Sequence, residues 1–377
     1  MTAAPDAQAV LTVDLGALAA NWRWLAAQAS GAECAAAVKA DAYGMGIAQA
    51  VPALATAGCQ TFFVAHLSEG ARARAALRDA GVSDRSVRIF ALHGFHPAQD
   101  DPAALERWRL QPVIGSPAEL RAWLAASPTL RAGGAALHVD TGMNRLGLDP
   151  EEAATLDNDT IAAAGLTLLM SHFVAAEEDA HPLTARQIAT FETLRRGPLG
   201  ALPASLANSS GMLLPQRPHY DLVRPGYALY GGNPLPGRPN PMRPVVTLDA
   251  RVLRTRTIEA GETAGYGALW RAARRTRIAA IGVGYADGLP RNARSVGETG
   301  GPVALVNEVR CPLVGRVSMD LSLIDVTDAG AVEAGATVQL LGAAIGVDEL
   351  GVACGTIGYE VLTRLGGRYT RRYVSTA

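Results

Sequence analysis

The chain has 377 residues, of which 49% are hydrophobic, so it can bury a sizeable core and is long enough for two domains. Its formal net charge of −1 does not favour binding to nucleic acid or to an anionic membrane surface. No apolar run is long enough to span a bilayer, the N-terminus lacks a signal peptide, and the four cysteines form no CxxC pair. These features are typical of a soluble cytoplasmic enzyme or ligand-binding protein with free thiols.

Short apolar runs alternate with alanine- and leucine-rich segments over the first two thirds of the chain. The apolar runs predict eight strands, at residues 33–39, 61–66, 87–92, 110–114, 135–140, 166–172, 204–208 and 220–224. The longer segments predict helices, at residues 15–28, 67–80, 102–109, 117–126, 150–164 and 182–195. Eight alternating units indicate a (β/α)8 barrel of the TIM type within an α/β fold, which we assign to residues 1–238.

Residues 233–241 interrupt this pattern with four prolines, which neither a helix nor a central strand accommodates, so we interpret them as a linker. Beyond the linker, strand-like runs separated by glycine turns lie at residues 245–257, 277–284, 303–306, 321–326 and 337–341. We therefore assign residues 239–377 to a C-terminal, mostly β domain. We expect residues 8–14, near the N-terminus, to form a strand that joins this second domain.

Lys39 is the only lysine among 34 basic residues, and the other 33 are arginines. Arginine replaces lysine readily on a surface, but only lysine can lose its proton in an apolar environment and attack a carbonyl group. Lys39 stands at the end of the first predicted barrel strand, on the face where barrel enzymes place catalytic groups. This position favours a Schiff-base lysine, and the alternative is chance retention on the surface.

A Schiff-base lysine in a barrel suggests pyridoxal 5′-phosphate (PLP), which also needs a phosphate site and a partner for its ring nitrogen. The loops after strands seven and eight of this fold commonly bind phosphate. Here they contain Asn208 and Ser209 after strand seven, and Arg224, Gly226 and Tyr227 after strand eight. The sequence therefore predicts a phosphate site next to Lys39.

The segment at residues 37–46, AVKADAYGMG, closely resembles the PLP-lysine signature of the alanine racemase family. Further matches follow in the family's order, at 140–147 (DTGMNRLG), 171–173 (SHF), 207–209 (ANS), 223–226 (VRPG), 265–267 (GYG), 284–288 (GYADG), 315–320 (GRVSMD) and 356–360 (TIGYE). The resemblance implies a PLP-dependent isomerase that interconverts L- and D-alanine, for peptidoglycan or for alanine breakdown. It also implies a homodimer in which the C-terminal β domain contributes to the partner's active site.

The resemblance assigns the two bases of the reaction. Lys39 would bind PLP and act as the base on one face of the substrate, and Tyr266 of the partner subunit would act on the opposite face. Two opposed groups suit racemisation, because one removes a proton from one face and the other returns a proton to the other. Tyr266 would need nearby positive groups to act as a base, and His172 and Arg224 are the candidates.

Other roles follow from the same resemblance. Arg224 would face the pyridine nitrogen of PLP and, being a poor proton donor, would leave that nitrogen unprotonated. Arg145 would hold the cofactor's phenolic oxygen and the substrate carboxylate, to which the partner's Met319 would add a backbone contact. The remaining cofactor-binding residues would be Tyr43, His172, Asn208, Ser209, Gly226, Tyr227 and Tyr359. An access channel narrow enough to favour alanine would be formed by Tyr285, Arg291, Arg316 and Tyr359.

One position departs from the family pattern. Many alanine racemases have a lysine two residues before the Asp of the DTGM motif, often carbamylated to orient the arginine, and here that residue is His138. Because Lys39 is the sole lysine, the sequence excludes carbamylation at this site. We predict that His138, or an anion that it binds, orients Arg145. The alternative is a strand histidine with satisfied hydrogen bonds and no role in the reaction.

Three alternative functions are compatible with part of this sequence pattern. A broader amino-acid racemase, acting on serine for example, would use the same scaffold. A related decarboxylase would have a carboxylate rather than Arg224 opposite the ring, and a non-catalytic PLP-binding barrel would lack the residues beyond the linker. The seven histidines form no HxH or HxxxH cluster, so we predict no metal site.

Overall fold

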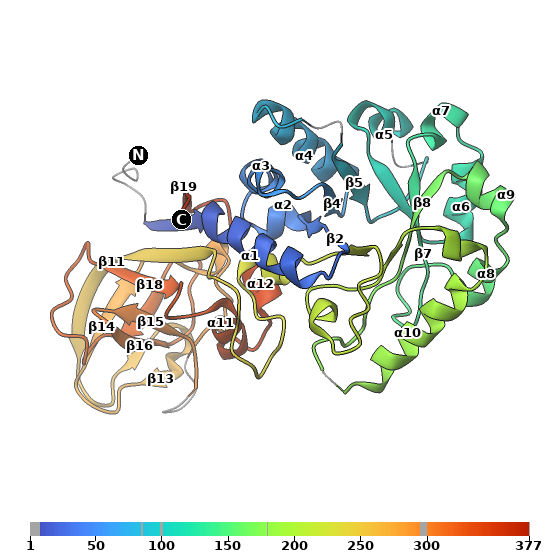
Figure 1. Ribbon diagram of the computed structural model, residues 1–377. Coiled ribbons are helices and arrows are strands. Elements are labelled where there is room, and N and C mark those ends of the chain that lie inside the picture. Colours follow the sequence, from blue (N-terminus) through green and yellow to red (C-terminus); the bar gives the residue numbers. More distant parts are fainter. Residues whose placement is uncertain (1–7, 84–85, 99–100, 179, 295–299, 377) are drawn as a thin grey trace.

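The computed structural model describes residues 8–83, 86–98, 101–178, 180–294 and 300–376. Figure 1 shows a barrel of alternating strands and helices beside a smaller domain built mainly of strands. The predicted fold class is therefore confirmed. No helix within these described ranges is long and apolar enough to cross a membrane.

Eight parallel strand positions close the barrel, and one of them is divided into the two short strands β2 (Glu33–Cys34) and β3 (Ala36–Ala37). The other strands are β4 (Thr61–Val64), β5 (Arg88–Ala91), β6 (Gln111–Ile114), β7 (Ala135–His138), β8 (Leu166–Met170), β9 (Ala204–Ser205) and β10 (Leu222–Val223). β2 and β3 are one predicted strand interrupted at Ala35, whose N–H donates to the carbonyl of Val223 at 2.9 Å. β10 pairs with β2, and the Arg224 N–H bonds the Ala207 carbonyl beyond β9, which completes the ring.

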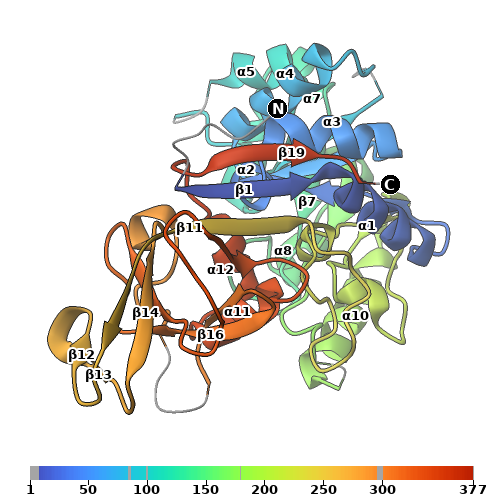
Figure 2. The same cartoon turned by 90° about the vertical axis from the view of Figure 1, so that its left-hand side faces the viewer.

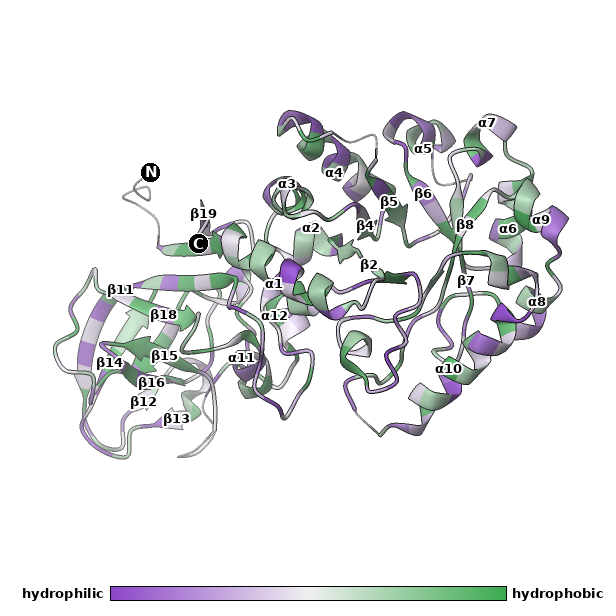
Figure 3. Cartoon of the chain, viewed as in Figure 1, coloured by the Kyte–Doolittle hydropathy of each residue, from purple (hydrophilic) through white to green (hydrophobic). Residues whose placement is uncertain are grey.

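Apolar side chains fill the centre of the barrel, so it is a packed core rather than a pore. Phe63 and Phe90 stack there at a centroid distance of 5.0 Å, among small and branched residues from the other strands. Figure 3 shows the apolar residues along these strands and more hydrophilic residues on the outer helices. A ligand therefore cannot enter the centre of the barrel, but it can bind above this plug, at the ends of the strands.

Helices surround the barrel at α1 (Leu15–Gln28), α3 (Ile47–Ala57), α4 (Leu67–Asp79), α5 (Pro102–Trp108), α6 (Pro117–Leu124), α7 (Pro128–Arg131), α8 (Pro150–Ala154), α9 (Asn158–Ala163) and α10 (Pro182–Arg195). Five of them begin with proline, whose fixed φ and missing N–H suit the first helical turn. The single helix expected at 150–164 is wrong. The chain forms α8 and α9 instead, because the Asp157 side chain accepts from the Thr160 N–H at 2.8 Å and starts a new helix.

The second domain is a closed sheet around the long strand β11 (Val246–Ile258). The other main strands are β14 (Thr276–Ile281), β15 (Val303–Val306), β16 (Val309–Val314), β17 (Ser322–Asp325) and β18 (Thr337–Leu341). β11 pairs with both β14 and β18, which closes the ring. Short elements complete the domain, namely the hairpin β12 (Thr263–Ala264) and β13 (Trp270–Arg271), and the helices α11 (Val347–Ala353) and α12 (Gly358–Thr363).

The first and last described strands, β1 (Ala9–Asp14) and β19 (Thr370–Val374), link the two domains. β1 pairs antiparallel with β11 and parallel with β19, as Figure 2 shows. β1 then runs directly into α1 at Asp14, whose Oδ1 accepts from the N–H groups of Gly16, Ala17 and Thr376 at 2.9 to 3.1 Å. One carboxylate thus caps the first barrel helix and fixes the last strand of the second domain.

Replacing Asp14 by alanine should lower the free energy of unfolding by about 1–2 kcal/mol, because it removes a helix cap and the bonds to Thr376 together. Urea unfolding monitored by tryptophan fluorescence measures the change. Asp79→Ala, an exposed aspartate at the C-terminal end of α4, is the matched control and should have little effect. Equal stability of the two variants would contradict the role assigned to Asp14.

Candidate active site

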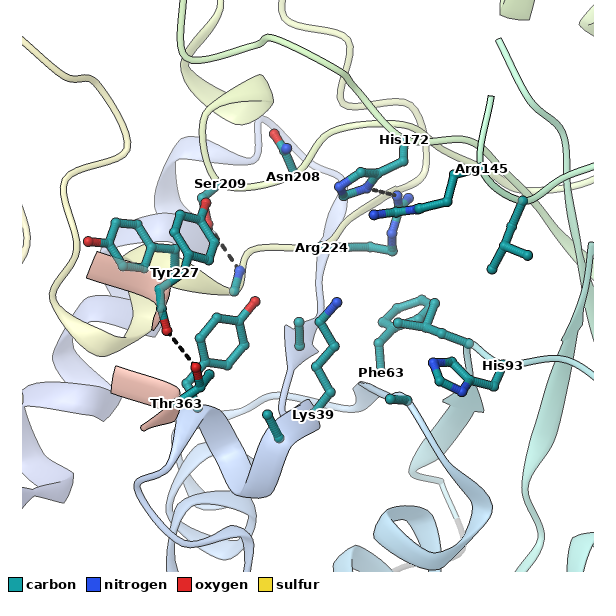
Figure 4. Close-up of a pocket in the computed structure, with 18 of the residues that line it drawn as sticks. Lys39, Phe63, His93, Arg145, His172, Asn208, Ser209, Arg224, Tyr227 and Thr363 are labelled. Carbon is teal, nitrogen blue, oxygen red and sulfur yellow. Dashed lines mark hydrogen bonds between the residues drawn. The ribbon is translucent and has the colours of Figure 1, made fainter. Parts of the chain in front are cut away.

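A cavity of about 680 Å³ opens above the barrel plug, at the C-terminal ends of the strands (Figure 4). Eleven residues predicted from the sequence line it, and they come from the ends of β3, β7, β8, β9 and β10 and from α12. They are Lys39, Tyr43, His138, Arg145, His172, Asn208, Ser209, Arg224, Gly226, Tyr227 and Tyr359. The fold thus brings together residues separated by more than 300 positions in the sequence.

Lys39 begins a segment with an unusual backbone. Ala40, Asp41, Ala42 and Tyr43 all have φ between 53° and 56°, and Gly44 has φ of 80°, so the chain makes one left-handed turn. Such a conformation costs non-glycine residues roughly 1–2 kcal/mol each and persists only where surrounding contacts stabilise it. Unusual backbone directly after a candidate nucleophile indicates that its position is under functional constraint.

Contacts from both domains stabilise this turn. Within the barrel, Asp41 accepts from the N–H of Ile47 at 3.0 Å and pairs with Arg72 at 2.5 Å. From the second domain, Arg371 Nη1 donates to the Gly44 carbonyl at 2.6 Å and the Tyr373 hydroxyl donates to the Met45 carbonyl at 3.0 Å. The side chains of β19 thereby hold the loop that carries Lys39.

The surroundings of Lys39 favour its neutral amine. Burial lowers the pKa of Lys39 from its usual value, and the positive charges of Arg145 and Arg224 lower it further. Glu69 opposes this effect. Figure 4 shows the side chain projecting into the space enclosed by His172, Ser209 and Arg224. A neutral amine in this position can act as a nucleophile and as a proton acceptor.

Arg224 is a buried cation with a fixed orientation. Its guanidinium donates to Ser205 Oγ and to the Ser171 carbonyl, both at 2.5 Å, and to His172 Nδ1 at 3.4 Å. Burial lowers the pKa of Arg224 to about 10, which still leaves it charged at neutral pH. Because arginine only donates, Nδ1 of His172 is the acceptor and Nε2 carries the proton. Burial and the neighbouring Arg224 lower the pKa of His172 well below its usual value, so this ring is neutral. Of the two positive groups expected for Tyr266, Arg224 is therefore the charged one, and the expectation of a positive His172 is wrong.

A second part of the cavity has the features of an anion site. Ser209 Oγ accepts from the N–H groups of Gly226 and Ala228 at 3.0 and 3.3 Å, so hydroxyl and amide groups gather at one place. A Cβ atom at position 226 would clash with the Tyr43 hydroxyl, so only glycine lets these groups approach each other. Backbone N–H groups and hydroxyls arranged in this way bind phosphate oxygens.

Aromatic rings wall this anion site. Tyr227 and Tyr359 stack at 3.9 Å between centroids, and Tyr43 stacks on Tyr230 at 4.6 Å. The Tyr227 hydroxyl donates to Asp348 of α11 at 2.7 Å, which ties the barrel to the helices of the second domain. These helices were not predicted, because α11 and α12 are short and the sequence pattern there resembles that of turns.

Arg145 and His138 lie at the cavity wall beside Arg224. Burial and the positive charge of Arg224 lower the pKa of His138 to about 4, so its ring is uncharged at neutral pH. The hydrogen bonds found among the described residues include none between His138 and the side chain of Arg145. The orienting role of His138 therefore stays a prediction, and a neutral ring would serve it by accepting a hydrogen bond rather than by charge.

The other predicted residues gather at a different place, on the surface of the second domain. The Tyr285 N–H bonds the Ser318 carbonyl at 3.0 Å, and the Ala286 N–H bonds the Met319 carbonyl at 2.9 Å. The loop of Tyr266 reaches the same region through Arg316, which adjoins Gly267. Tyr266 is 65% exposed and Met319 54% exposed. Neither these residues nor Arg291 line the cavity of their own chain.

Several cavity residues were not identified from the sequence. Phe63 forms the floor, and its ring lies 5.7 Å from the Arg224 guanidinium. His93 follows β5 and contacts His66 at 4.2 Å between rings. Thr363 and Glu360 come from α12. His93 could have been found from its position after a predicted strand, whereas α12 reaches the cavity only because the second domain packs on the barrel.

Comparison with known proteins agrees with this geometry. Residues 13–234 match the family model described as alanine racemase, N-terminal domain, and residues 245–373 match the model of the C-terminal domain. The chain belongs to the alanine racemase family. The predicted family membership is thus confirmed.

Members of this family are similar to the chain over its full length. An alanine racemase of Methylobacterium nodulans is 54% identical over 99% of this chain and 98% of its own length. The crystal structure of a Bartonella henselae alanine racemase, with covalently bound pyridoxal phosphate, superposes with a TM-score of 0.87 at 34% identity, over 98% of this chain and all of that one. The biosynthetic enzyme of Pseudomonas aeruginosa gives 0.86 at 37% identity, over 98% and 99%.

The low pKa of His138 predicts that stability depends on pH. The folded protein holds this ring neutral down to about pH 4, whereas an unfolded chain protonates it near 6.5. The contribution is therefore complete above pH 6.5 and is lost as the pH falls toward 4, by about 3 kcal/mol. When urea unfolding is measured between about pH 4 and pH 6.5, the free energy of unfolding of His138→Gln should decline less steeply than that of the wild type. A decline in His138→Gln as steep as that of the wild type would refute the assignment.

Proposed function

We propose that this chain interconverts L- and D-alanine with pyridoxal 5′-phosphate held at Lys39, as a homodimer in which each cavity is completed by the partner. The observation that carries the proposal is the sole lysine of the chain, half-buried at the barrel mouth in a cavity that also contains Arg145, Arg224 and an anion site. The family membership supports the same reaction.

The residues of the cavity suit this cofactor. Its volume lies within the range of small-molecule sites. Ser209, Gly226 and Tyr43 would hold the phosphate, Arg224 would face the ring nitrogen, and Lys39 would supply the amine for the aldehyde. Asn208, Tyr227 and Tyr359 would enclose the phosphate end, and His172 would lie against the ring. The cationic side chains of Lys39, Arg145 and Arg224 complement a ligand with phosphate and carboxylate groups.

The cofactor, when bound, withdraws electrons from Cα and makes its hydrogen acidic. The protein must then move a proton at Cα on each face. The lowered pKa of Lys39 lets its amine accept and return this proton on the face that the barrel presents. Arg224 stays charged and does not readily give up a proton, so it limits electron withdrawal by the ring and disfavours side reactions.

Arg145 would bind the substrate carboxylate, since its planar guanidinium can make two parallel hydrogen bonds to one carboxylate. Its side chain is exposed at the rim of the cavity. We assign its orientation to His138, the neutral ring on the neighbouring wall. Nε2 of His172 carries the ring proton, so it can donate a hydrogen bond to the phenolate of Tyr266 when the partner subunit brings that side chain into the cavity.

The opposite face of Cα needs a second proton carrier, and Tyr266 of the partner subunit would provide it. Its loop is exposed and contributes nothing to the cavity of its own chain. Large apolar residues are exposed both at the cavity and beside the Tyr266 loop. They are Leu146 and Ile357 at the cavity and Leu269 beside the loop. A head-to-tail dimer would bury these residues and bring Tyr266, Tyr285 and Met319 to the other chain's Lys39, with Arg291 and Arg316 along the access channel.

Turnover of L-alanine with D-amino-acid oxidase detection tests the function. The wild-type holoenzyme should form D-alanine, and Lys39→Arg, which keeps the charge but not the nucleophile, should lose roughly 1000-fold or more. Arg23→Ala, an exposed basic residue on α1, is the control and should retain full activity. No D-alanine from wild-type enzyme with PLP bound would reject the proposal, and serine competition measures the breadth of the substrate range.

A further inference from the structure

The segment that follows α12 contacts the exposed loops of the second domain that carry Tyr285 and Met319. α12 carries Tyr359 into the cavity of its own chain, and the chain then continues through residues 364–369 into β19. The Gly366 N–H donates to the Asp287 carbonyl at 3.0 Å. Residues 364–369 therefore lie against the loops that carry Tyr285 and Met319.

Arg368 joins these two loops through their carboxylates. Its Nε lies 3.2 Å from Asp287 Oδ1, and its Nη1 donates to Asp320 Oδ1 at 2.9 Å. Asp287 lies two residues after Tyr285, and Asp320 directly follows Met319. One guanidinium therefore spans both loops, as its planar arrangement of donors allows. The hydrogen bond to Asp320 and the charge of Asp287 raise the pKa of Arg368, so it stays charged.

Asp287 is the most buried of these three charged residues, Arg368, Asp287 and Asp320. It is 4% exposed, and its Oδ2 accepts from the Gly284 N–H at 2.8 Å, which fixes the turn that presents Tyr285. A buried carboxylate needs a compensating charge, and Arg368 supplies it. Without Arg368 the carboxylate would be paired only by backbone groups, and the turn would relax toward solvent.

We propose that Arg368 is a positioning residue for the active site of the partner subunit. It acts through Asp287 and Asp320 on Tyr285 and Met319, and this role rests on the proposed function, in which those residues complete the partner's cavity. Arg368 does not line the cavity of its own chain. Arg371, three residues later, bonds the Gly44 carbonyl in the Lys39 loop of its own chain. Neighbouring arginines of one segment thus serve two different active sites.

Steady-state kinetics of the holoenzyme gives the first test. Arg368→Ala should raise KM for alanine about 10-fold or more with a smaller change in kcat, because the backbone of Met319 would contact the substrate carboxylate in the partner's cavity. Arg368→Lys should recover part of the loss, and Asp320→Asn should raise KM without disturbing the buried Asp287. The exposed Arg372→Ala is the matched control. PLP content per subunit should stay at the wild-type value in all variants. A fall in PLP content, or a loss confined to kcat, would overturn the proposal.

Hybrid dimers give the decisive test. One subunit carries Lys39→Ala and the other Tyr266→Phe, so the only intact site combines Lys39 of the second subunit with Tyr266 of the first. Arg368→Lys or Arg368→Ala placed in the first subunit should raise KM of that site, and the same change in the second subunit should leave KM within 2-fold, roughly, of the parent hybrid. Equal effects from both positions, or an effect from the second alone, would overturn the proposal. An inactive parent hybrid would instead reject the shared active site itself.

Discussion

The backbone that presents Lys39 is held in a conformation that the barrel does not stabilise alone. Four consecutive residues with left-handed φ follow the lysine, at a cost of roughly 1–2 kcal/mol each. Arg371 and Tyr373 of β19 bond the carbonyls at the end of this turn, and β19 is in register with β1 at the start of the chain. The position of one side chain in the barrel therefore depends on the second domain.

Electrostatics follows from the same packing. The side chains of Lys39, Arg145 and Arg224 share one cavity, and burial lowers the pKa of Lys39 while Arg224 remains charged. Two histidines in this field stay neutral because burial and the neighbouring Arg224 disfavour their protonation. The cavity therefore has two arginines, a lysine amine with a lowered pKa and an anion site. This combination suits a ligand with phosphate and carboxylate groups.

The sequence predicted the barrel well, because its period of strand and helix is regular and each strand is apolar. It also predicted the residues at the strand ends, such as Lys39, Ser209 and Arg224, because chemistry in this fold gathers there. It did not predict α12, Phe63 or the left-handed turn. α12 is too short to show a helical period in the sequence. Phe63 cannot be told from other core phenylalanines by sequence alone. The alanine at position 40 gives no sign of its positive φ, because glycine or asparagine is the usual residue there. The contact between Arg368 and Asp287 depends on tertiary packing alone.

Exchange of the Cα hydrogen with deuterium from D₂O tests most directly whether two groups act from opposite faces of the substrate. In Tyr266→Phe, Lys39 can still remove and return the proton on its own face. One alanine enantiomer should therefore exchange at nearly the wild-type rate, and the other should lose exchange by about 100-fold or more. Equal loss for both enantiomers, or unchanged exchange for both, would contradict the assignment of Lys39 and Tyr266 to opposite faces.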